Sequence, residues 1–128
     1  MGNRKPRKPK VEPPPRRGEV YLVAFDPTVG SEIRKTRPAV ILQNDVGNRA
    51  SSTTIVAAVS SQIHEPPYPI EVVVEPREGG LAARSAVRLD QIRTVDRRRL
   101  IRRLGLLQPE TMHMVDRAIA ISFGLVNF

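Results

Sequence analysis

Residues 53–60 read Thr-Thr-Ile-Val-Ala-Ala-Val-Ser (TTIVAAVS), and this run decides the fold class. β-Branched residues dominate it, and their side chains fit the pleated surface of a strand better than they fit a helix. The run therefore predicts a strand. The segments on either side are interpreted outward from it.

Upstream, two more runs have the composition of strands. EVYLVAF (residues 19–25) carries β-branched and aromatic residues on both faces, which is typical of a strand buried on both sides. PAVILQ (residues 38–43) predicts a second strand, with Pro38 at its start, where a missing backbone N–H is tolerated. NDVGNR (residues 44–49) predicts a turn that leads into the third strand.

Downstream, the strand signals are shorter. IEVVVE (residues 70–75) alternates apolar and charged residues, as a half-exposed strand does. Residues 85–89 and 91–95 predict two further short strands on either side of Asp90.

The C-terminal part has helical signals. Asp96 is a suitable N-cap for a helix over RRRLIRRL (residues 97–104), and Gly105 would close it. Pro109 stands where a second helix can begin, and apolar residues recur behind it at helical spacing, namely Met112, Val115, Ile119 and Phe123. Five or six short strands followed by helices predict a mainly β fold, a small antiparallel barrel with a C-terminal helix packed on it.

Positive charge is concentrated at the N-terminus. The formal net charge is +8, of which residues 1–17 supply +6 and residues 18–128 only +2. With five prolines and few apolar side chains, residues 1–17 predict a disordered basic arm, and residues 18–128 predict one folded domain. Basic groups that neutralise phosphates favour a nucleic-acid partner. Composition leaves open whether the arm is a tether for RNA or a solubilising leader.

Several classes of chemistry are absent from the sequence. The chain has no cysteine, which excludes disulfides, thiolate metal sites and cysteine nucleophiles. His64 and His113 belong to no metal-spacing motif, so we expect surface histidines and no metal or other cofactor. No apolar run approaches the roughly 18 residues of a membrane span, and no secretory signal is recognisable, so we expect a cytoplasmic protein.

One loop gathers groups suited to phosphoryl chemistry: Ser31, Glu32 and, at the mouth of the second strand, Arg37. RNA can be cut without a metal when its own 2′-OH attacks the adjacent phosphorus. That route needs a proton acceptor, a proton donor and positive charge on the phosphorane, and a guanidinium suits the last role. Spacing alone, however, favours a surface salt bridge between Glu32 and Arg37 over a catalytic site.

Longer stretches carry a family resemblance. The segments GSEIRKTRPAVILQND (30–45), VGNRASSTTIVAAVSSQI (46–63), YPIEVVV (68–74) and DQIRTVD (90–96) occur in this order. With them, the chain from residue 17 to residue 128 resembles the MazF/PemK family of type II toxin–antitoxin endoribonucleases. The strand that ends in S-S-Q, combined with the later D-Q-I-R, is the most specific part of the match.

The resemblance implies an SH3-like barrel of the MazF/CcdB kind that works as a homodimer. It also implies metal-independent, sequence-specific cleavage of single-stranded RNA, blocked by a cognate MazE-type antitoxin. Residue by residue, the family's catalytic arginine falls on Arg37, its motif glutamate on Glu32 and its catalytic threonine on Ser60. Serine keeps the hydroxyl but lacks the methyl group that restricts χ1, so we expect a less pre-organised hydroxyl and surviving activity.

Four polar residues near these positions are candidates for RNA contacts, because amides and hydroxyls can bind exposed base edges: Ser31, Thr36, Gln62 and Gln91. Two alternatives stay open, since one barrel hosts several functions. One is a non-catalytic, CcdB-like toxin directed at gyrase. The other is an RNA-binding module that has lost catalysis.

Overall fold

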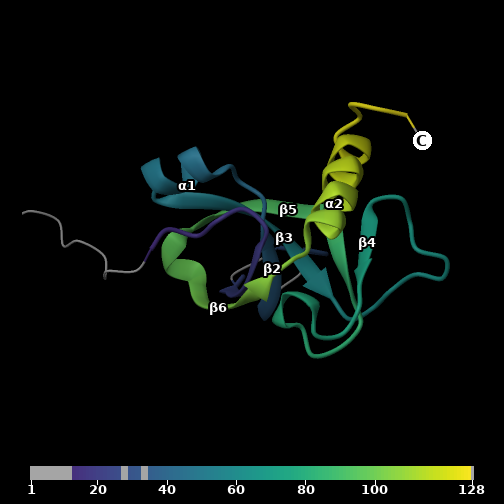
Figure 1. The fold of residues 1–128 in the computed structure, drawn as a ribbon, viewed down its shortest axis with the longest axis horizontal. Coiled ribbons are helices and arrows are strands. Elements are labelled where there is room, and N and C mark those ends of the chain that lie inside the picture. The colour runs from purple at the N-terminus through teal and green to yellow at the C-terminus, as the bar shows by residue number, and fades with distance from the viewer. Residues whose placement is uncertain (1–12, 27–28, 33–34, 128) are drawn as a thin grey trace, which may run out of the picture.

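The protein folds as one antiparallel sheet with a helix across it (Figure 1). The computed structural model describes residues 13–26, 29–32 and 35–127. Its six strands follow the order β4-β5-β3-β2-β1-β6. The bounds of the strands are β1 Glu19–Ala24, β2 Thr36–Ile41, β3 Thr53–Ser60, β4 Glu71–Val74, β5 Ser85–Asp96 and β6 Leu100–Leu106.

The predicted fold class is confirmed. Strand β3 has the predicted bounds, 53–60, and helix α2 (Pro109–Ser122) begins at the predicted proline. Within the described part of the chain no pairing joins β4 to β6, so hydrogen bonds do not close the barrel there. Helix α2 contacts β4 and β5 and thereby covers one face of the sheet.

The helix expected over residues 97–104 was wrong. Asp96 does cap a turn, since its carboxylate accepts from the backbone N–H of Arg98 at 2.8 Å, but only the 3-10 helix η2 (Arg97–Arg99) follows before β6. Strand β6 pairs along β1, and such tertiary pairing overrides a weak helix propensity. Arginines at i, i+4 would also repel one another in a helix. Gly105 permits close approach rather than closing a helix, because a Cβ there would lie 2.4 Å from the carbonyl carbon of Gly79.

Two other expectations need correction. Residues 85–96 form the single strand β5 rather than two strands, with an irregularity in its pairing to β3 where a break at Asp90 was expected. The predicted turn at 44–49 is mostly helix α1 (Asp45–Ala50), because the side chain of Asn44 accepts from the N–H of Gly47 at 2.7 Å and caps it. A third short helix, η1 (Glu78–Gly80), precedes β5.

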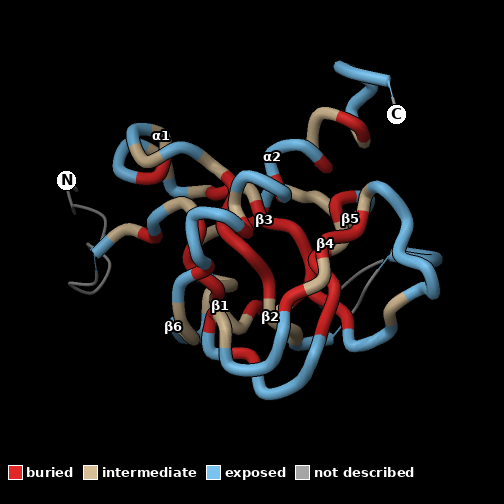
Figure 2. The backbone as a smooth tube through the Cα atoms, turned by 45° about the vertical axis from the view of Figure 1, so that its right-hand side comes forward, coloured by how far each residue is buried: buried red, intermediate tan, exposed pale blue. Residues whose placement is uncertain are grey.

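The two faces of the sheet bury separate apolar clusters. The larger cluster lies under α2 and includes Val115 and Ala118 of that helix. The smaller cluster, on the other face, includes Val23, Ala39 and Ala58. Side chains alternate across a strand, so the central strands contribute to both. Figure 2 shows the buried residues concentrated along these strands.

The expected basic arm is described from Pro13 onward, while residues 1–12 lie outside the described residues. The backbone N–H of Arg17 donates to Asp45 at 2.8 Å, and its guanidinium binds the carbonyl of Leu42 at 2.8 Å and the carboxylate of Asp116 at 2.6 Å. The N–H of Arg17 lowers the pKa of Asp45 from its ordinary value. Residue 17 is therefore held against both helices. None of the described helices is long and apolar enough to cross a membrane.

Candidate functional site

Strands β2 and β3 bring Arg37 and Ser60 to the same level of the sheet. These strands pair with Ala39 opposite Ala58 and with Val40 opposite Ala57. When this register is continued by two residues, Arg37 stands level with Ser60. Alternation places Arg37 on the face of Ala39 and Ser60 on the face of Ala58, both of which belong to the smaller cluster. The two side chains therefore share the face that α2 leaves uncovered.

Ser60 is fixed at the end of its strand. The residue is 7% exposed, and its Oγ accepts from the backbone N–H of Gln62 at 3.1 Å. Short turns of this kind are common where serine ends a strand. A hydroxyl that accepts one bond can still donate its own hydrogen, so Ser60 can present a donor to an anionic group.

A second guanidinium lies on the face of Arg37. Arg93 of β5 stands opposite Val56, another member of the smaller cluster. Its Nη1 donates to the carbonyl of Phe25 at 3.3 Å, and its Cζ lies 5.3 Å from the centroid of that ring. This cation–π contact fixes the arginine across the sheet. Arg37 and Arg93 thus place two guanidinium groups on one face of the sheet.

Glu32 and Ser31 lie in the loop between β1 and β2, and both are exposed. The carboxylate of Glu32 accepts from the N–H of Val29 at 2.6 Å, and the N–H of Glu32 donates to the carbonyl of Val29 at 3.2 Å. At the end of the loop, the N–H of Lys35 donates to Asp26 at 2.9 Å. The described contacts of Glu32 are thus local to its own turn.

The remaining predicted RNA contacts are divided between the two faces and the loops. Thr36, the first residue of β2, pairs with Ala24, and alternation turns it away from the face of Arg37. Gln91 shares the face of Arg93, two residues along β5. Gln62 is exposed directly after Ser60. Arg37, Ser60 and Gln91 therefore share one face of the sheet, Gln62 follows Ser60 in the chain, and Thr36 faces the other way.

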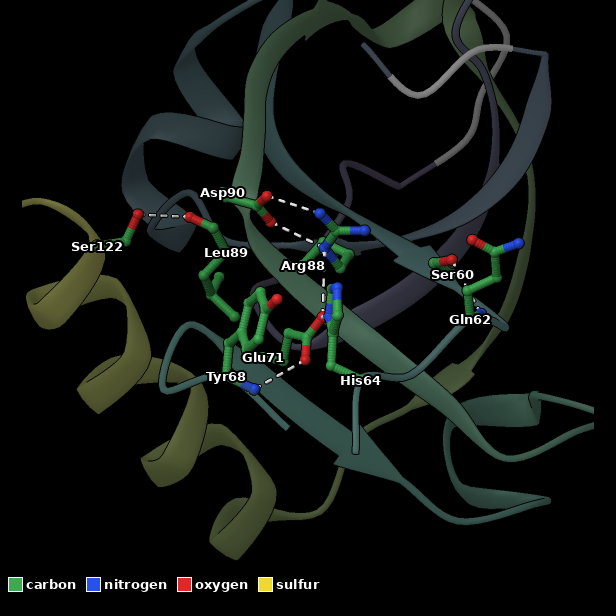
Figure 3. Close-up of polar contacts among 9 residues, drawn as sticks. All are labelled: Ser60, Gln62, His64, Tyr68, Glu71, Arg88, Leu89, Asp90 and Ser122. Atoms are coloured by element: carbon green, nitrogen blue, oxygen red, sulfur yellow. Dashed lines mark hydrogen bonds and ion pairs between the residues drawn. The ribbon is translucent and has the colours of Figure 1, made fainter. Parts of the chain in front are cut away.

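A polar network next to these residues was not predicted (Figure 3). His64, expected to be a surface histidine, places Nδ1 2.6 Å from Oε2 of Glu71, whose side chain is fully buried. Oε1 of Glu71 accepts from the N–H of Tyr68 at 2.9 Å, and Nε of Arg88 lies 3.8 Å from Oε2. Arg88 also binds Asp90 through two hydrogen bonds of 2.9 and 2.7 Å, which raise its pKa.

The burial of Glu71 also corrects the expectation that residues 70–75 form a half-exposed strand. In β4 only Val73 is partly exposed, because the loop that precedes the strand folds back over Glu71. A glutamate that alternates with valines was the available signal in the sequence. It indicated a carboxylate that would need partners if the strand were covered.

The register relates this network to Ser60. Ser60 stands opposite Ala86 of β5, and Ala86 stands opposite Val73 of β4. Glu71 pairs with Arg88 across the same two strands. Glu71 is two residues before Val73, and Arg88 is two residues after Ala86, so alternation places both on the face of Ser60. The network therefore borders the Ser60 side of the candidate site.

The other histidine does not join this group. His113 is exposed on α2, which covers the opposite face of the sheet. In the described ranges, no three His, Asp or Glu side chains come together in a way that could hold a metal ion.

Comparisons with known proteins find similar sequences and one matching family. A family model for the PemK-like, MazF-like toxin of type II toxin–antitoxin systems matches residues 16–123. The endoribonuclease EndoA of Bacillus subtilis is 42% identical over 113 residues, covering 88% of this chain and 97% of that protein. The endoribonuclease MazF of Staphylococcus epidermidis is 45% identical over 113 residues, covering 88% of this chain and 94% of that protein.

Solved structures match at lower identity and show the fold alone. The crystal structure of MazF from Deinococcus radiodurans superposes with a TM-score of 0.77 at 24% identity, covering 88% of this chain and 99% of that one. An endoribonuclease from a mycobacterial species, solved in complex with its cognate antitoxin, gives a TM-score of 0.74 at 24% identity, covering 89% of this chain and 99% of that one.

Proposed function

The chain belongs to the family of PemK-like, MazF-like toxins of type II toxin–antitoxin systems, and from this premise we propose that Arg37 and Ser60 cleave single-stranded RNA at specific sequences. The enzyme is an endoribonuclease, the class of its relatives at 42 and 45% identity. Neither the gyrase-directed toxin nor the RNA-binding module without catalysis is favoured by these relatives.

The observation that carries the proposal is the register of β2 and β3, which, continued by two residues, sets Arg37 level with Ser60 on one face. In the proposed reaction the 2′-oxygen attacks phosphorus, and the bond from phosphorus to the 5′-oxygen breaks. The proton of the 2′-OH passes to a base, and another proton reaches the departing 5′-oxygen. Arg37 stabilises the phosphorane, and the hydroxyl of Ser60 donates to a non-bridging oxygen, so this route requires no metal.

Glu32 is the proposed proton acceptor. A carboxylate can accept several hydrogen bonds, so the contact with Val29 is compatible with that role. Gln62 and Gln91 are proposed to contact bases beside the scissile phosphate, and Ser31 and Thr36 to contact nucleotides farther along the strand. Residues 18–128 form the proposed catalytic domain.

Partners follow from the family and its relatives. We assign to this toxin a cognate antitoxin of the MazE type, as the mycobacterial relative was solved with its own antitoxin, and a homodimeric state. A toxin that cuts RNA acts where RNA is, which places it in the cytoplasm. The basic arm, of which residues 13–17 lie against the domain, is proposed to add salt-sensitive affinity for RNA.

The test is incubation of the purified protein with a long single-stranded RNA in excess EDTA, followed by mapping of the cut ends. We expect cuts at one short recurring sequence with 5′-hydroxyl ends. Arg37→Ala should lower the rate about 10²- to 10³-fold. Arg49→Ala, an exposed arginine of α1, serves as the matched control and should cut normally. Full activity in Arg37→Ala would refute the assignment.

A further inference from the structure

We propose that the rings of His64 and Tyr68 form a stacking platform for one unpaired nucleobase next to the scissile phosphate. The inference rests on the proposed function, because it assigns a further subsite to the same RNA. It concerns two residues of the loop 61–70, which joins β3 to β4, that the proposed function does not use.

The two rings already form a stack on the surface. Their centroids lie 3.8 Å apart, and their planes are inclined by 13°. Tyr68 is 52% exposed, and the side chain of His64 is 43% exposed. Each ring covers one face of the other, so a third ring would stack on an outer face of the pair.

A buried carboxylate fixes both residues of the stack. One buried carboxylate, that of Glu71, binds His64 through one oxygen and the backbone of Tyr68 through the other. Arg88 lies 3.8 Å from this carboxylate. A surface ring that is already fixed loses little conformational entropy when a base stacks on it.

The platform lies beside the proposed catalytic residues. His64 follows Ser60 by four residues, and four extended residues span at most about 14 Å. In the view of Figure 3, His64 lies between Tyr68 and the pair formed by Ser60 and Gln62. In this view the face of His64 that Tyr68 does not cover is turned toward Ser60, which the proposed function assigns to the scissile phosphate. The exposed amide of Gln62 stands where it can bind the edge of a stacked base.

The chemistry of the platform suits single-stranded RNA. Unpaired bases stack on histidine and tyrosine, and such stacking tolerates different bases because every base has a π-face. On the same face of the sheet, Phe25 is buried in the smaller cluster and Tyr21 is partly buried against it, so neither ring is as exposed as those of His64 and Tyr68. The occupant is therefore an unpaired base, bound through ring contact rather than through a charge on His64.

The test uses a tiled set of single-stranded RNA oligonucleotides with one 2-aminopurine each, because the fluorescence of this base is quenched when it stacks. A 2′-deoxyribose at the cut site prevents cleavage during the measurement. Two variants separate stacking from other roles. His64→Ala and His64→Phe both lose the hydrogen bond to Glu71, but only His64→Ala loses the ring.

With the unmodified protein we expect strong quenching at one position beside the cut. His64→Ala should abolish it and raise the Kd about 10-fold, whereas His64→Phe should keep both the quenching and the Kd. Equal losses in the two variants, or quenching that persists in His64→Ala, would overturn the platform. Cleavage of unmodified RNA is recorded alongside. Uncut RNA refutes the proposed function, whereas normal cutting with unaltered Kd in His64→Ala refutes only the platform.

Discussion

The two loops beside the candidate site differ in how they are held. The loop between β1 and β2 is bound by distant residues at its start, where Arg93 and Arg99 donate to the carbonyls of Phe25 and Asp26, but the described contacts of Glu32 stay within its own turn. The loop between β3 and β4 is fixed by the buried carboxylate of Glu71, which binds two of its residues. A motif of neighbouring residues, such as the one that contains Glu32, can be recognised in a sequence. The contacts that Glu71 makes from the following strand cannot. The better-fixed loop is therefore the one that the sequence motif does not mark.

The largest expected effect concerns the first loop. Glu32→Gln keeps an oxygen that can accept from Val29, so the turn should survive, but an amide is not a useful base. If Glu32 accepts the proton, kcat should fall about 10²-fold or more, with an unchanged melting temperature. The measurement is the pH profile of RNA cleavage. An unaltered profile would reduce Glu32 to a residue that shapes its loop.

The next effect concerns the second loop. Glu71→Gln weakens the contacts with His64 and Arg88 in a buried setting, and the free energy of unfolding should fall by about 2 kcal/mol. Glu75→Gln is the matched control, because that side chain is 68% exposed and pairs with Arg84 at 3.3 Å. It should cost less than about 0.5 kcal/mol. Urea denaturation measures both, and equal losses would mean that the buried carboxylate of Glu71 stabilises the fold no more than an exposed one.

A smaller effect is expected where the second loop begins. Ser60→Thr adds the methyl group that restricts χ1, at a position whose cross-strand partner is the small residue Ala86. We expect kcat to rise roughly threefold, because fewer rotamers of the hydroxyl compete. Initial rates on one defined oligonucleotide would measure this change. A fall in kcat would mean that the serine hydroxyl is already well placed.

The smallest effect lies outside both loops. The side chain and backbone N–H of Arg98 lower the pKa of Asp96 from 3.8 to about 2. A carboxylate with a depressed pKa stabilises the fold fully above its unfolded pKa and loses this contribution as pH falls through its folded pKa. The stability difference between the protein and Asp96→Asn should therefore be constant above pH 5 and shrink between pH 4 and pH 2. Thermal melts across that range test this, and a difference that persists at pH 2 would contradict the pairing.

Local composition predicted most of the fold. The errors arose because composition does not show which distant segments pair. The β-branched residues of 53–60 determined strand β3, and Pro109 marked the start of α2. Residues 97–104 have helical spacing, yet Leu100, Arg102 and Arg103 pair with β1, and this partner is distant in sequence. Likewise Arg37 and Ser60 were identified by resemblance, but only the pairing of β2 with β3 relates them in space.

Strand β6 has a consequence for how copies of the protein meet in concentrated solution. It is an edge strand of the sheet, and its Ile101 and Leu106 are 52% and 56% exposed. An exposed apolar edge strand can pair with further copies of the chain and so lead to cross-β aggregation. Arg102 and Arg103 interrupt that edge with like charges, which act as gatekeepers against such growth. Arg102 and Arg103, which belonged to the predicted helix, thus help to prevent association of the sheet through its open edge.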